Sequence, residues 1–354
     1  MSLFKELKII DLSTVLAGPS VGTFFAELGA EVIKIESPKI PDVTRSWKLP
    51  TEDKSTNVSA YFSSVNYKKH YLEADLKNSE ELEEVKQLIC SADILLSNFK
   101  PGDDAKFGLT DSQLHDLNPS LIIGKINGFG TESDRVAYDL ILQAETGFMS
   151  MNGTPESGPV KMPVALIDVL AAHHLKEGIL ISLLERERTG KGASISVSLY
   201  DAAVCSLMNQ ASNFLMENFV PQRIGSLHPN IAPYGELFTT ADNALITFAI
   251  GSQLHFEKLC HLLECPELLN DKRFISNQLR VLNRTVLQHY LQEKVAKWNA
   301  IELLKSTQQL FIPCGKVKDL AAVFETENAR KLVRKEIING QETSRITAIA
   351  CQWK

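Results

Sequence analysis

Apolar runs and helical patterns alternate through the first 200 positions of the chain. Short continuous apolar runs, which are typical of strands buried on both faces, occupy residues 7–13, 31–37, 92–99 and 121–128. Helical patterns lie between them at residues 17–30 and 79–90. Strands that alternate with helices in this rhythm predict an α/β fold with a Rossmann-like parallel sheet, which binds ligands at the carboxyl ends of its strands.

The later residues predict a second, smaller domain. A long helix is expected from Asp168 to residue 187, followed by a strand at 194–198 and a single helix at 200–217. Three prolines make residues 219–236 a plausible linker. Beyond it, strand-like and then mostly helical segments predict an α+β domain over residues 230–320.

Charge and composition exclude several classes of partner. The chain has 354 residues and a formal net charge of −6, so it lacks the broad positive surface that nucleic acids require. Its most apolar run, residues 163–184, contains several charged side chains and predicts no membrane span. The first residues show no basic region followed by an apolar run, so no signal peptide is expected and a cytoplasmic location fits.

The cysteines and histidines predict no metal site. Six cysteines are spaced without any CxxC pair, which predicts neither a disulfide framework nor a zinc site. His173 and His174 have no HExxH-type spacing, and no GxSxG motif accompanies them. Neither a bound metal nor a serine triad is therefore expected.

Two features point to an anionic ligand. Residues 15–20, VLAGPS, place a small-residue turn between a strand and a helix, where backbone N–H groups bind anions, although neither GxGxxG nor the Walker pattern is present. Basic side chains also occupy loops expected after strands: Arg45, Lys68, Lys69, Lys100, Lys106 and Arg135. Together they suggest a ligand with several phosphates. The alternatives are an ordinary strand–helix turn and solvated surface charge.

Asp168 interrupts the apolar stretch PVALIDVLAAHH where the long helix is expected to begin. As a helix N-cap, its carboxylate would accept backbone hydrogen bonds, which stabilise a protein by about 1 kcal/mol. The same geometry would lower its pKa and keep the group ionised. An ionised carboxylate can attack an activated acyl group, so the residue fits both a cap and a nucleophile.

Several longer segments carry a resemblance to a known family. In the first half they are IIDLSTVLAGPSVGTFFAELGAEVIKIESP, DVTRSW, NYKKHYLEADLK and ADILLSNFKPGDDAKFGL. Further along they are VAYDLILQAETGFMSMNG, ALIDVLAAHHLKEGILISLLERERTGKGASISVSLYDA, RIGSLHPNIAPYGELF, DKRFISNQLRVLNR and FIPCGKV. Over nearly its whole length the chain therefore resembles the family III CoA-transferases, which include formyl-CoA transferase, CaiB and BaiF and share a superfamily with the α-methylacyl-CoA racemases.

The resemblance implies an enzyme that moves CoA between an acyl-CoA donor and a carboxylic acid acceptor, with coenzyme A as co-substrate. Asp168 matches the family's nucleophile. It would attack the donor thioester to give a mixed anhydride and CoA thiolate, and the thiolate would return to form an aspartyl-CoA thioester. The acceptor carboxylate would then be activated and captured by CoA, so that each acyl transfer conserves the activation energy.

Contacts with CoA are implied position by position. Leu16 and Ala17 match the turn that meets the nucleotide, and Lys69 matches a basic position after a strand at Asn66. Ser37 replaces an arginine of formyl-CoA transferase, so one phosphate contact is not carried over. The full set of expected cofactor-binding residues is Leu16, Ala17, Arg45, Lys69, Asn98, Phe99, Lys100, Lys106 and Arg135.

Two alternative functions stay open. The racemase branch uses a histidine–aspartate pair, matched here by Tyr138 and Asp139, together with the shared aspartate. Tyrosine is a poor general base at neutral pH, so its presence favours transfer over racemisation. The second alternative is a non-catalytic CoA-binding subunit, because the chain ends at Lys354, before a tail that many members carry.

The resemblance also implies the substrate pocket and the assembly. Tyr138 and Asp139 are expected in the substrate pocket, and an apolar lining is suggested by Phe148, Met149 and Met151. The family's fold is an interlocked homodimer of two ring-like chains, so no folded monomer is expected. A large CoA-binding α/β domain would then comprise residues 1–225, completed by residues 325–354, beside the small α+β domain at 230–320.

Overall fold

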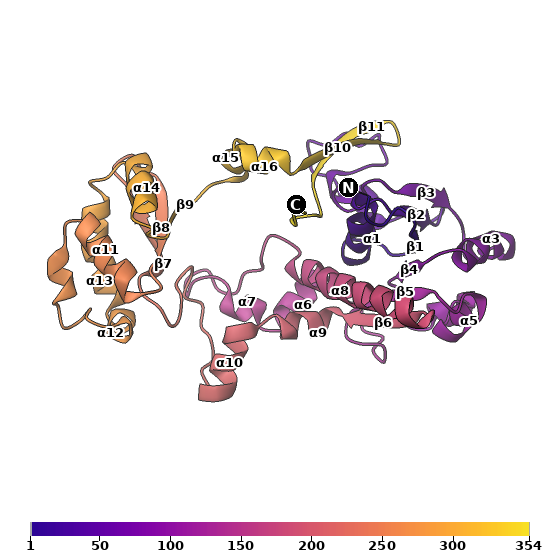
Figure 1. Cartoon of the computed structure of the whole chain (residues 1–354), viewed down its shortest axis with the longest axis horizontal. Coiled ribbons are helices and arrows are strands. Elements are labelled where there is room, and N and C mark those ends of the chain that lie inside the picture. Colours follow the sequence, from indigo (N-terminus) through magenta and orange to yellow (C-terminus); the bar gives the residue numbers. More distant parts are fainter. Residues whose placement is uncertain (1, 354) are drawn as a thin grey trace. The chain divides into compact units, whose positions relative to one another are not determined.

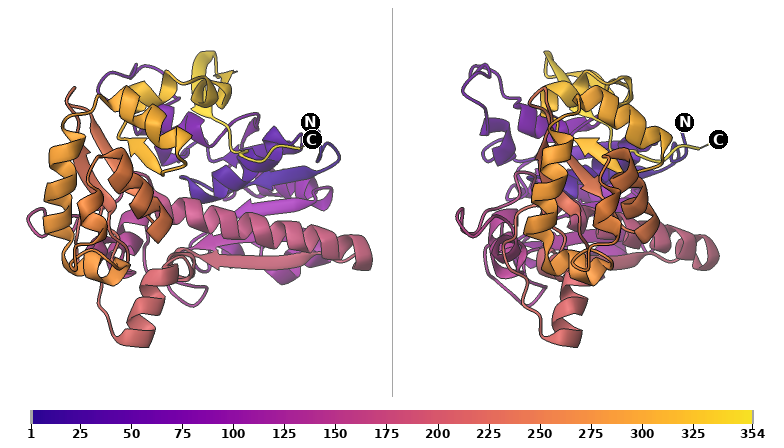
Figure 2. Two further views of the ribbon diagram at one scale, coloured as in Figure 1. Left: turned by 60° about the vertical axis from the view of Figure 1, so that its left-hand side comes forward. Right: turned by 90° about the vertical axis from the view of Figure 1, so that its left-hand side faces the viewer.

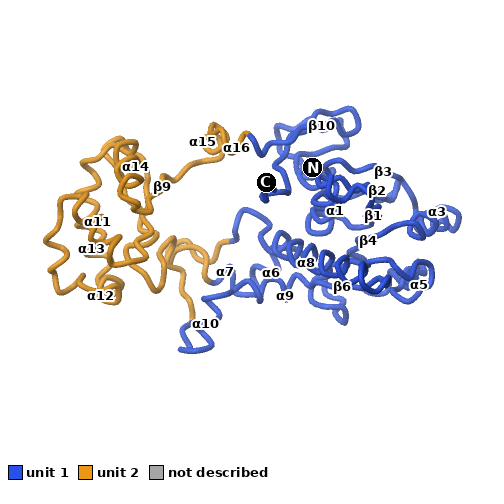
Figure 3. The backbone as a smooth tube through the Cα atoms, viewed as in Figure 1, with its two compact units in different colours: residues 1–150, 161–219, 331–354 blue, residues 151–160, 220–330 orange. Residues whose placement is uncertain are grey.

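The computed structural model describes residues 2–353, which form two compact units (Figures 1 and 3). The first unit contains Met1–Ser150, Lys161–Phe219 and Lys331–Lys354. The second contains Met151–Val160 and Val220–Arg330. The chain therefore leaves the first unit twice, for residues 151–160 and for residues 220–330.

A six-stranded sheet of order β3-β2-β1-β4-β5-β6 forms the centre of the first unit. All of its strand pairs are parallel. The strands are β1 (Lys8–Asp11), β2 (Glu31–Glu36), β3 (His70–Glu73), β4 (Ile94–Ser97), β5 (Ile122–Asn127) and β6 (Ala193–Ser198). The chain adds strands outward from β1 in one direction and then from β4 in the other, so the switch point for ligand binding lies between β1 and β4.

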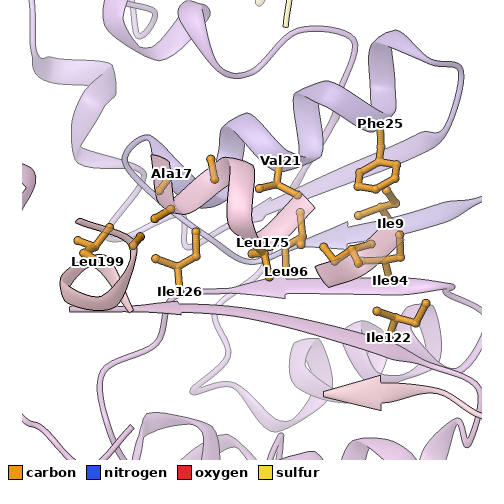
Figure 4. Packing of buried hydrophobic residues seen from close by; sticks show 14 of the residues in the cluster. Ile9, Ala17, Val21, Phe25, Ile94, Leu96, Ile122, Ile126, Leu175 and Leu199 are labelled. Carbon is orange, nitrogen blue, oxygen red and sulfur yellow. The ribbon is translucent and has the colours of Figure 1, made fainter. Parts of the chain in front are cut away.

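Helices cover both faces of this sheet because successive strand residues point to opposite sides. On one face, α1 (Ala17–Glu27) and α8 (Leu166–Thr189) pack together over a core that includes Ile9 (Figure 4). Figure 2 shows the long helix α8 running along the sheet. On the other face, α3 (Ser79–Cys90) and α5 (Asp111–Leu117) pack near Ile10.

The predicted single helix over residues 200–217 is wrong. Two helices, α9 (Leu199–Cys205) and α10 (Met208–Glu217), occupy the segment. Tight turns close α9, where the N–H groups of Ser206 and Leu207 donate to carbonyls three residues earlier. Met208 then takes a positive φ of 46°, so the helix cannot continue through it. The other helices of the first unit are short: η1 (Val43–Ser46), α2 (Ala60–Ser64), α4 (Asp103–Phe107), α6 (Asp139–Glu145) and α7 (Phe148–Met151).

A C-terminal hairpin that the sequence reading missed completes the first unit. It pairs β10 (Val333–Ile338) with β11 (Gln341–Ile346) in antiparallel register. Glu27, the last residue of α1, accepts hydrogen bonds from the side chains of Arg345 and Thr347. Both members of the Glu27–Arg345 ion pair are buried, so the hairpin is tied firmly to α1.

The second unit combines a small antiparallel sheet with helices. The sheet has the order β7-β8-β9, formed by β7 (Tyr234–Thr239), β8 (Leu245–Ala249) and β9 (Cys314–Lys316). Around it lie α11 (Gln253–Leu262), η2 (Pro266–Leu269), α12 (Asn277–Leu282), α13 (Arg284–Val295), α14 (Ala300–Gln309), α15 (Leu320–Phe324) and α16 (Glu327–Lys331). Its own core centres on Phe238, Phe248 and Phe256. Within residues 2–353, no helix is long and apolar enough to cross a membrane.

Candidate active site

A hollow of about 250 Å³ lies at the carboxyl ends of the central strands, where α1 begins. We call it the Asp168 hollow. It is smaller than the roughly 300–1,000 Å³ of most small-molecule sites, so it fits the reacting end of a long ligand better than the whole of one. Its walls include Thr14, Val15, Leu16, Ala17, Asn98, Phe99, Lys100, Asn127, Gly128, Asp134, Arg135, Tyr138, Asp168 and Leu199.

The turn between β1 and α1 forms one wall and is held by two side chains. Val15 has a φ of 74°, a strained conformation for a β-branched residue. Its N–H donates to Asp42 Oδ2 at 3.1 Å. The Asn98 side chain holds Thr14, the residue before Val15, by accepting from the Thr14 N–H and donating to the Thr14 carbonyl, both at 3.0 Å. These contacts offset the strain and fix the turn beside the hollow.

Asp168 also lines the hollow, but it does not cap its helix. Helix α8 begins at Leu166, and Asp168 is its third residue. Its side chain is only 8% exposed, and no described residue donates a hydrogen bond to its carboxylate. The expectation of a capping carboxylate is therefore wrong, and the carboxylate is available for chemistry.

The pKa of Asp168 moves in the opposite direction to the expectation. Burial, with the nearby Asp139 carboxylate as the smaller cause, raises the pKa of Asp168 to about 7. Both causes disfavour the charged form, and no capping hydrogen bond opposes them. A carboxyl group with a pKa this close to neutrality is a common feature of active sites.

Asp139 supplies the cap that Asp168 does not. Its Oδ1 accepts from the Ile167 N–H at 2.7 Å, and its Oδ2 accepts from Gln143 at 2.6 Å. Gln143 in turn accepts from the Met162 N–H at 2.8 Å, which fixes the segment that leads into α8. Asp139 is 9% exposed and is not among the residues that line the hollow, so it lies behind Asp168.

Three aromatic side chains gather beside Asp168, and the sequence reading singled out only one of them. Tyr138 lines the hollow, and its ring lies 6.4 Å from that of Trp47. Trp47 also contacts Tyr61, with ring centroids 5.1 Å apart. Burial and the charge of Asp168 raise the pKa of Tyr61 to about 12, so its hydroxyl stays protonated as a donor near the carboxylate. Trp47 stood within the motif DVTRSW, which could have identified it.

Lys100 and Arg135 bring positive charge to the hollow. Arg135 is held by Glu145 at 2.6 Å and stacks over Phe129, with its guanidinium carbon 3.9 Å from the ring centre. Lys100 is exposed and makes no ion pair with a described residue. The hollow therefore combines a buried carboxylate with two cations that suit an anionic ligand.

The structure brings together six of the nine expected CoA contacts and separates the other three. Those on the hollow are Leu16, Ala17, Asn98, Phe99, Lys100 and Arg135. Arg45 lines a different hollow of about 820 Å³ and pairs with Glu36 through two hydrogen bonds. Lys106 lies on a third hollow and pairs with Asp103 at 2.7 Å.

Lys69 is the clearest departure from the expected set. It precedes β3, and Asn66 lies between α2 and that strand, so the expected strand at Asn66 is wrong. The Lys69 ammonium is fully buried and donates to Asp11 at 2.8 Å, to the Pro19 carbonyl at 2.8 Å and to Asn66 at 2.9 Å. With three acceptors already in place, it has no donor left for CoA.

The expected apolar lining by Phe148, Met149 and Met151 stays a prediction. None of Phe148, Met149 and Met151 is among the residues that line the hollow. Phe148 instead packs against the large core beneath α8. The apolar part of the wall comes from other residues: Val15, Phe99, Ile126, Val136 and Leu199.

The pKa of Asp168 gives a direct pH prediction. With Asp168 as the nucleophile that the resemblance implies, we expect kcat/KM for an acyl-CoA to rise with pH and to level off above about 7, because only the ionised carboxylate can attack. Initial rates at subsaturating acyl-CoA between pH 5.5 and 8.5 would measure this. A profile that stays flat across that range would contradict it.

An Asp139→Asn variant serves as the contrast. It removes one of the two causes that raise the pKa of Asp168, while the asparagine oxygen can still accept from the Ile167 N–H. The midpoint of the profile should therefore move to lower pH. Asp116→Asn makes the same change at a distant helix and should leave the midpoint in place.

Comparisons with known proteins fit this geometry. The sequence profile of CoA-transferase family III matches residues 4–354. Succinate–glutarate CoA-transferase from Agrobacterium fabrum is 36% identical over 324 residues, which cover 90% of this chain and 80% of that protein. Acetyl-CoA:oxalate CoA-transferase from Acetobacter aceti is 34% identical over 322 residues, covering 90% of this chain and 81% of that protein.

A solved structure extends the similarity to three dimensions. The crystal structure of a CaiB/BaiF family protein from Brucella suis is 35% identical to this chain. It superposes with a TM-score of 0.83 and covers 98% of this chain and 91% of that one. The parallel six-stranded sheet with additional small antiparallel sheets is thus an architecture that this chain shares with a family member.

Proposed function

The chain belongs to CoA-transferase family III, and from that premise we propose that it transfers CoA between an acyl-CoA and a carboxylic acid through covalent intermediates on Asp168. The observation that carries the proposal is the Asp168 carboxylate itself. It is buried, accepts no hydrogen bond from a described residue, and lines a hollow that also holds two cations. An unpaired buried carboxylate is costly for a fold, so its presence is best explained by chemistry.

The first half of the reaction loads CoA onto the enzyme. An Asp168 oxygen attacks the thioester carbon of the donor, the C–S bond breaks, and CoA thiolate leaves with the electron pair. The product is a mixed anhydride between the donor acyl group and Asp168. The thiolate then attacks the Asp168 carbonyl of the anhydride, which gives an aspartyl-CoA thioester and releases the donor as its carboxylate.

The second half repeats these steps with the acceptor. Its carboxylate attacks the aspartyl thioester and expels CoA thiolate, which forms a new mixed anhydride. Thiolate attack on the acceptor's carbonyl then yields the new acyl-CoA and restores the Asp168 carboxylate. Each step exchanges one activated acyl bond for another, so no external energy source is needed.

Donors for the developing oxyanions are available where α1 begins. Leu16 is the N-cap residue of α1, its side chain makes no capping hydrogen bond, and both Leu16 and Ala17 line the hollow. The first N–H groups of a helix favour a negative charge in front of them. We assign this backbone turn, held by Asp42 and Asn98, as the group that stabilises the tetrahedral intermediates.

Transfer is favoured over racemisation by the side chain at position 138. The racemase branch has a histidine where Tyr138 lines the hollow, and a phenol is a poor base at neutral pH. Incubation of the protein with a branched acyl-CoA in deuterium oxide distinguishes a transferase from a racemase. Exchange of deuterium into the α-position without an acceptor acid would identify a racemase.

The acceptor is proposed to be a small dicarboxylic acid. Relatives are named for transfer to or from glutarate, oxalate and mesaconate, all of which carry a second carboxylate. Lys100 and Arg135 could bind that second carboxylate while the first reacts at Asp168.

An exchange assay tests this specificity. With succinyl-CoA as donor, we expect glutarate and other dicarboxylates to accept CoA at least about tenfold faster than monocarboxylates of equal length. Lys100→Gln should reduce that preference, and Lys86→Gln, on the distant α3, should leave it unchanged. Equal rates for glutarate and for pentanoate, the monocarboxylate of the same length, would rule out a dicarboxylate site.

The assembly is proposed to be a homodimer. On α10, Met208, Leu215 and Met216 are between 72% and 77% exposed, and on α8 Ile181 and Leu184 are 66% and 65% exposed. Apolar side chains exposed in groups along a helix usually mark a protein interface.

Sedimentation tests the dimer. We expect a single species near twice 39.3 kDa over a wide concentration range, because a second copy would cover these side chains. A Leu215→Asp, Met216→Asp double variant should sediment at lower mass or aggregate. A wild-type protein that sediments as a folded monomer at micromolar concentration would contradict the proposal.

A further inference from the structure

The second unit contains a buried arginine that no carboxylate neutralises. Arg280, on α12, is 2% exposed and forms no ion pair with a described residue. Its Nε donates to the Ala232 carbonyl at 3.0 Å, and its Nη1 donates to Gln253 Oε1 at 2.9 Å and to the Phe274 carbonyl at 3.0 Å. Its guanidinium carbon lies 4.2 Å from the ring centre of Phe256. A buried charge that lacks a counter-ion is expensive, so its retention calls for an explanation.

One edge of this guanidinium remains unused. Nη2 makes no hydrogen bond with any described residue, although it carries two of the five donors of the group. Arg280 lines a hollow of about 470 Å³, which we call the Arg280 hollow. Its polar wall consists of Gly251, Ser252, Gln253, Ser276, Asn277 and Arg280, and no acidic side chain lines it.

The other polar groups of this wall also have donors to offer. Ser252 and Ser276 cap α11 and α12 by accepting from the N–H groups of His255 and Leu279. Neither hydroxyl donates to a described residue, and neither does the Nε2 amide of Gln253. The ten-residue helix α11 begins at the same place, and its N-terminal end favours negative charge. All of these groups therefore present donors or positive potential.

We propose that the Arg280 hollow binds a small oxyanion, either a carboxylate or a phosphate, between Arg280 Nη2 and the hydroxyls of Ser252 and Ser276. The oxyanion supplies the counter-charge that the chain does not. Paired oxygens of a carboxylate or phosphate match the donors of a guanidinium edge. The volume suits a small organic acid or inorganic phosphate and is too small for coenzyme A. This site is separate from Asp168 in the chain and does not depend on the proposed transfer reaction.

Calorimetric titration at constant ionic strength tests the site, with inorganic phosphate, acetate and succinate as probes. We expect saturable binding of at least one probe to the wild-type protein, and the probe that binds identifies a phosphate or a carboxylate site. Gln253→Glu places an acidic group on Arg280 and should weaken binding more than about tenfold. Gln309→Glu adds the same charge to an exposed position of the same unit and should leave the affinity unchanged.

Two further variants keep the outcome decisive. Arg135→Gln removes a cation from the Asp168 hollow, so binding that survives this change is not binding to that hollow. Ser276→Ala removes one proposed donor without changing a charge and should weaken binding several-fold. This variant still tests the site if Gln253→Glu does not fold. The proposal is overturned if no probe saturates, if Gln253→Glu binds like Gln309→Glu, or if Arg135→Gln alone abolishes binding.

Discussion

Replacing Asp168 with alanine is expected to lower kcat/KM for CoA exchange by at least about 10⁴-fold, because the variant has no group that can form the anhydride. The Asp168 carboxylate accepts no hydrogen bond from a described residue, so its removal leaves no donor unpaired. The variant should therefore fold, and its free energy of unfolding at pH 7 should be no lower than that of the wild type.

The Asp168 carboxyl group also makes the stability of the wild-type protein depend on pH. The raised pKa means that the native state binds more protons than the unfolded state between about pH 4 and pH 7. Stability from this group is therefore present below pH 4 and is lost as the pH rises through 7, and Asp168→Asn should remove that slope. Asp201→Asn, at an exposed position on α9, should leave both exchange and stability unchanged. Residual exchange above about one-hundredth of wild type in Asp168→Ala would require another nucleophile.

Replacing Lys69 with methionine is expected to destabilise the protein by about 3–5 kcal/mol, because it leaves the Asp11 carboxylate buried in the core without a counter-ion. Burial opposes ionisation of Asp11, but the charges of Lys69 and Lys34 outweigh it and lower the pKa of that carboxyl group. Both side chains of the Asp11–Lys69 pair are fully buried, so solvent would not replace the lost ammonium. Urea unfolding measures the loss.

Two controls separate a structural role from a ligand contact. Lys68→Met changes the exposed neighbour and should alter stability by less than about 0.5 kcal/mol. Adding Asp11→Asn to Lys69→Met should recover part of the lost stability, because the double variant no longer contains the unpaired buried carboxylate. If Lys69→Met unfolds like Lys68→Met yet raises KM for acyl-CoA, Lys69 belongs to the CoA site after all.

Four strands of the sheet, β1, β2, β4 and β5, were predictable because they lie in continuous apolar runs, whereas β3, with the mostly exposed sequence HYLE, was not predicted. The strand predicted at residues 31–37 is observed at Glu31–Glu36, and the strand predicted at residues 121–128 is observed at Ile122–Asn127. The C-terminal hairpin was missed although its signal was present, since Asn339-Gly340 lies between two strand-like segments. The alternating charged residues of those strands hid it from a search for apolar runs.

The features of the site that the sequence predicted wrongly depend on contacts between residues far apart in the sequence. Helix α8 begins before Asp168 because the Ile167 N–H donates to Asp139, which lies 28 residues before Ile167. The pKa of Asp168 follows from burial and from that same neighbour, and neither can be seen in a local motif. Lys69 was misassigned because lysines are usually at the surface, whereas this one is buried against Asp11.

Direct detection of an adduct on Asp168 tests the central claim. The protein is quenched during turnover with an acyl-CoA and an acceptor acid, digested, and the peptide that contains Asp168 is weighed. We expect that peptide to carry the mass of a CoA thioester or of the acyl group, and hydroxylamine to convert Asp168 into its hydroxamate. Full turnover with an unmodified Asp168 peptide under quench conditions that preserve thioesters would contradict covalent catalysis by this residue.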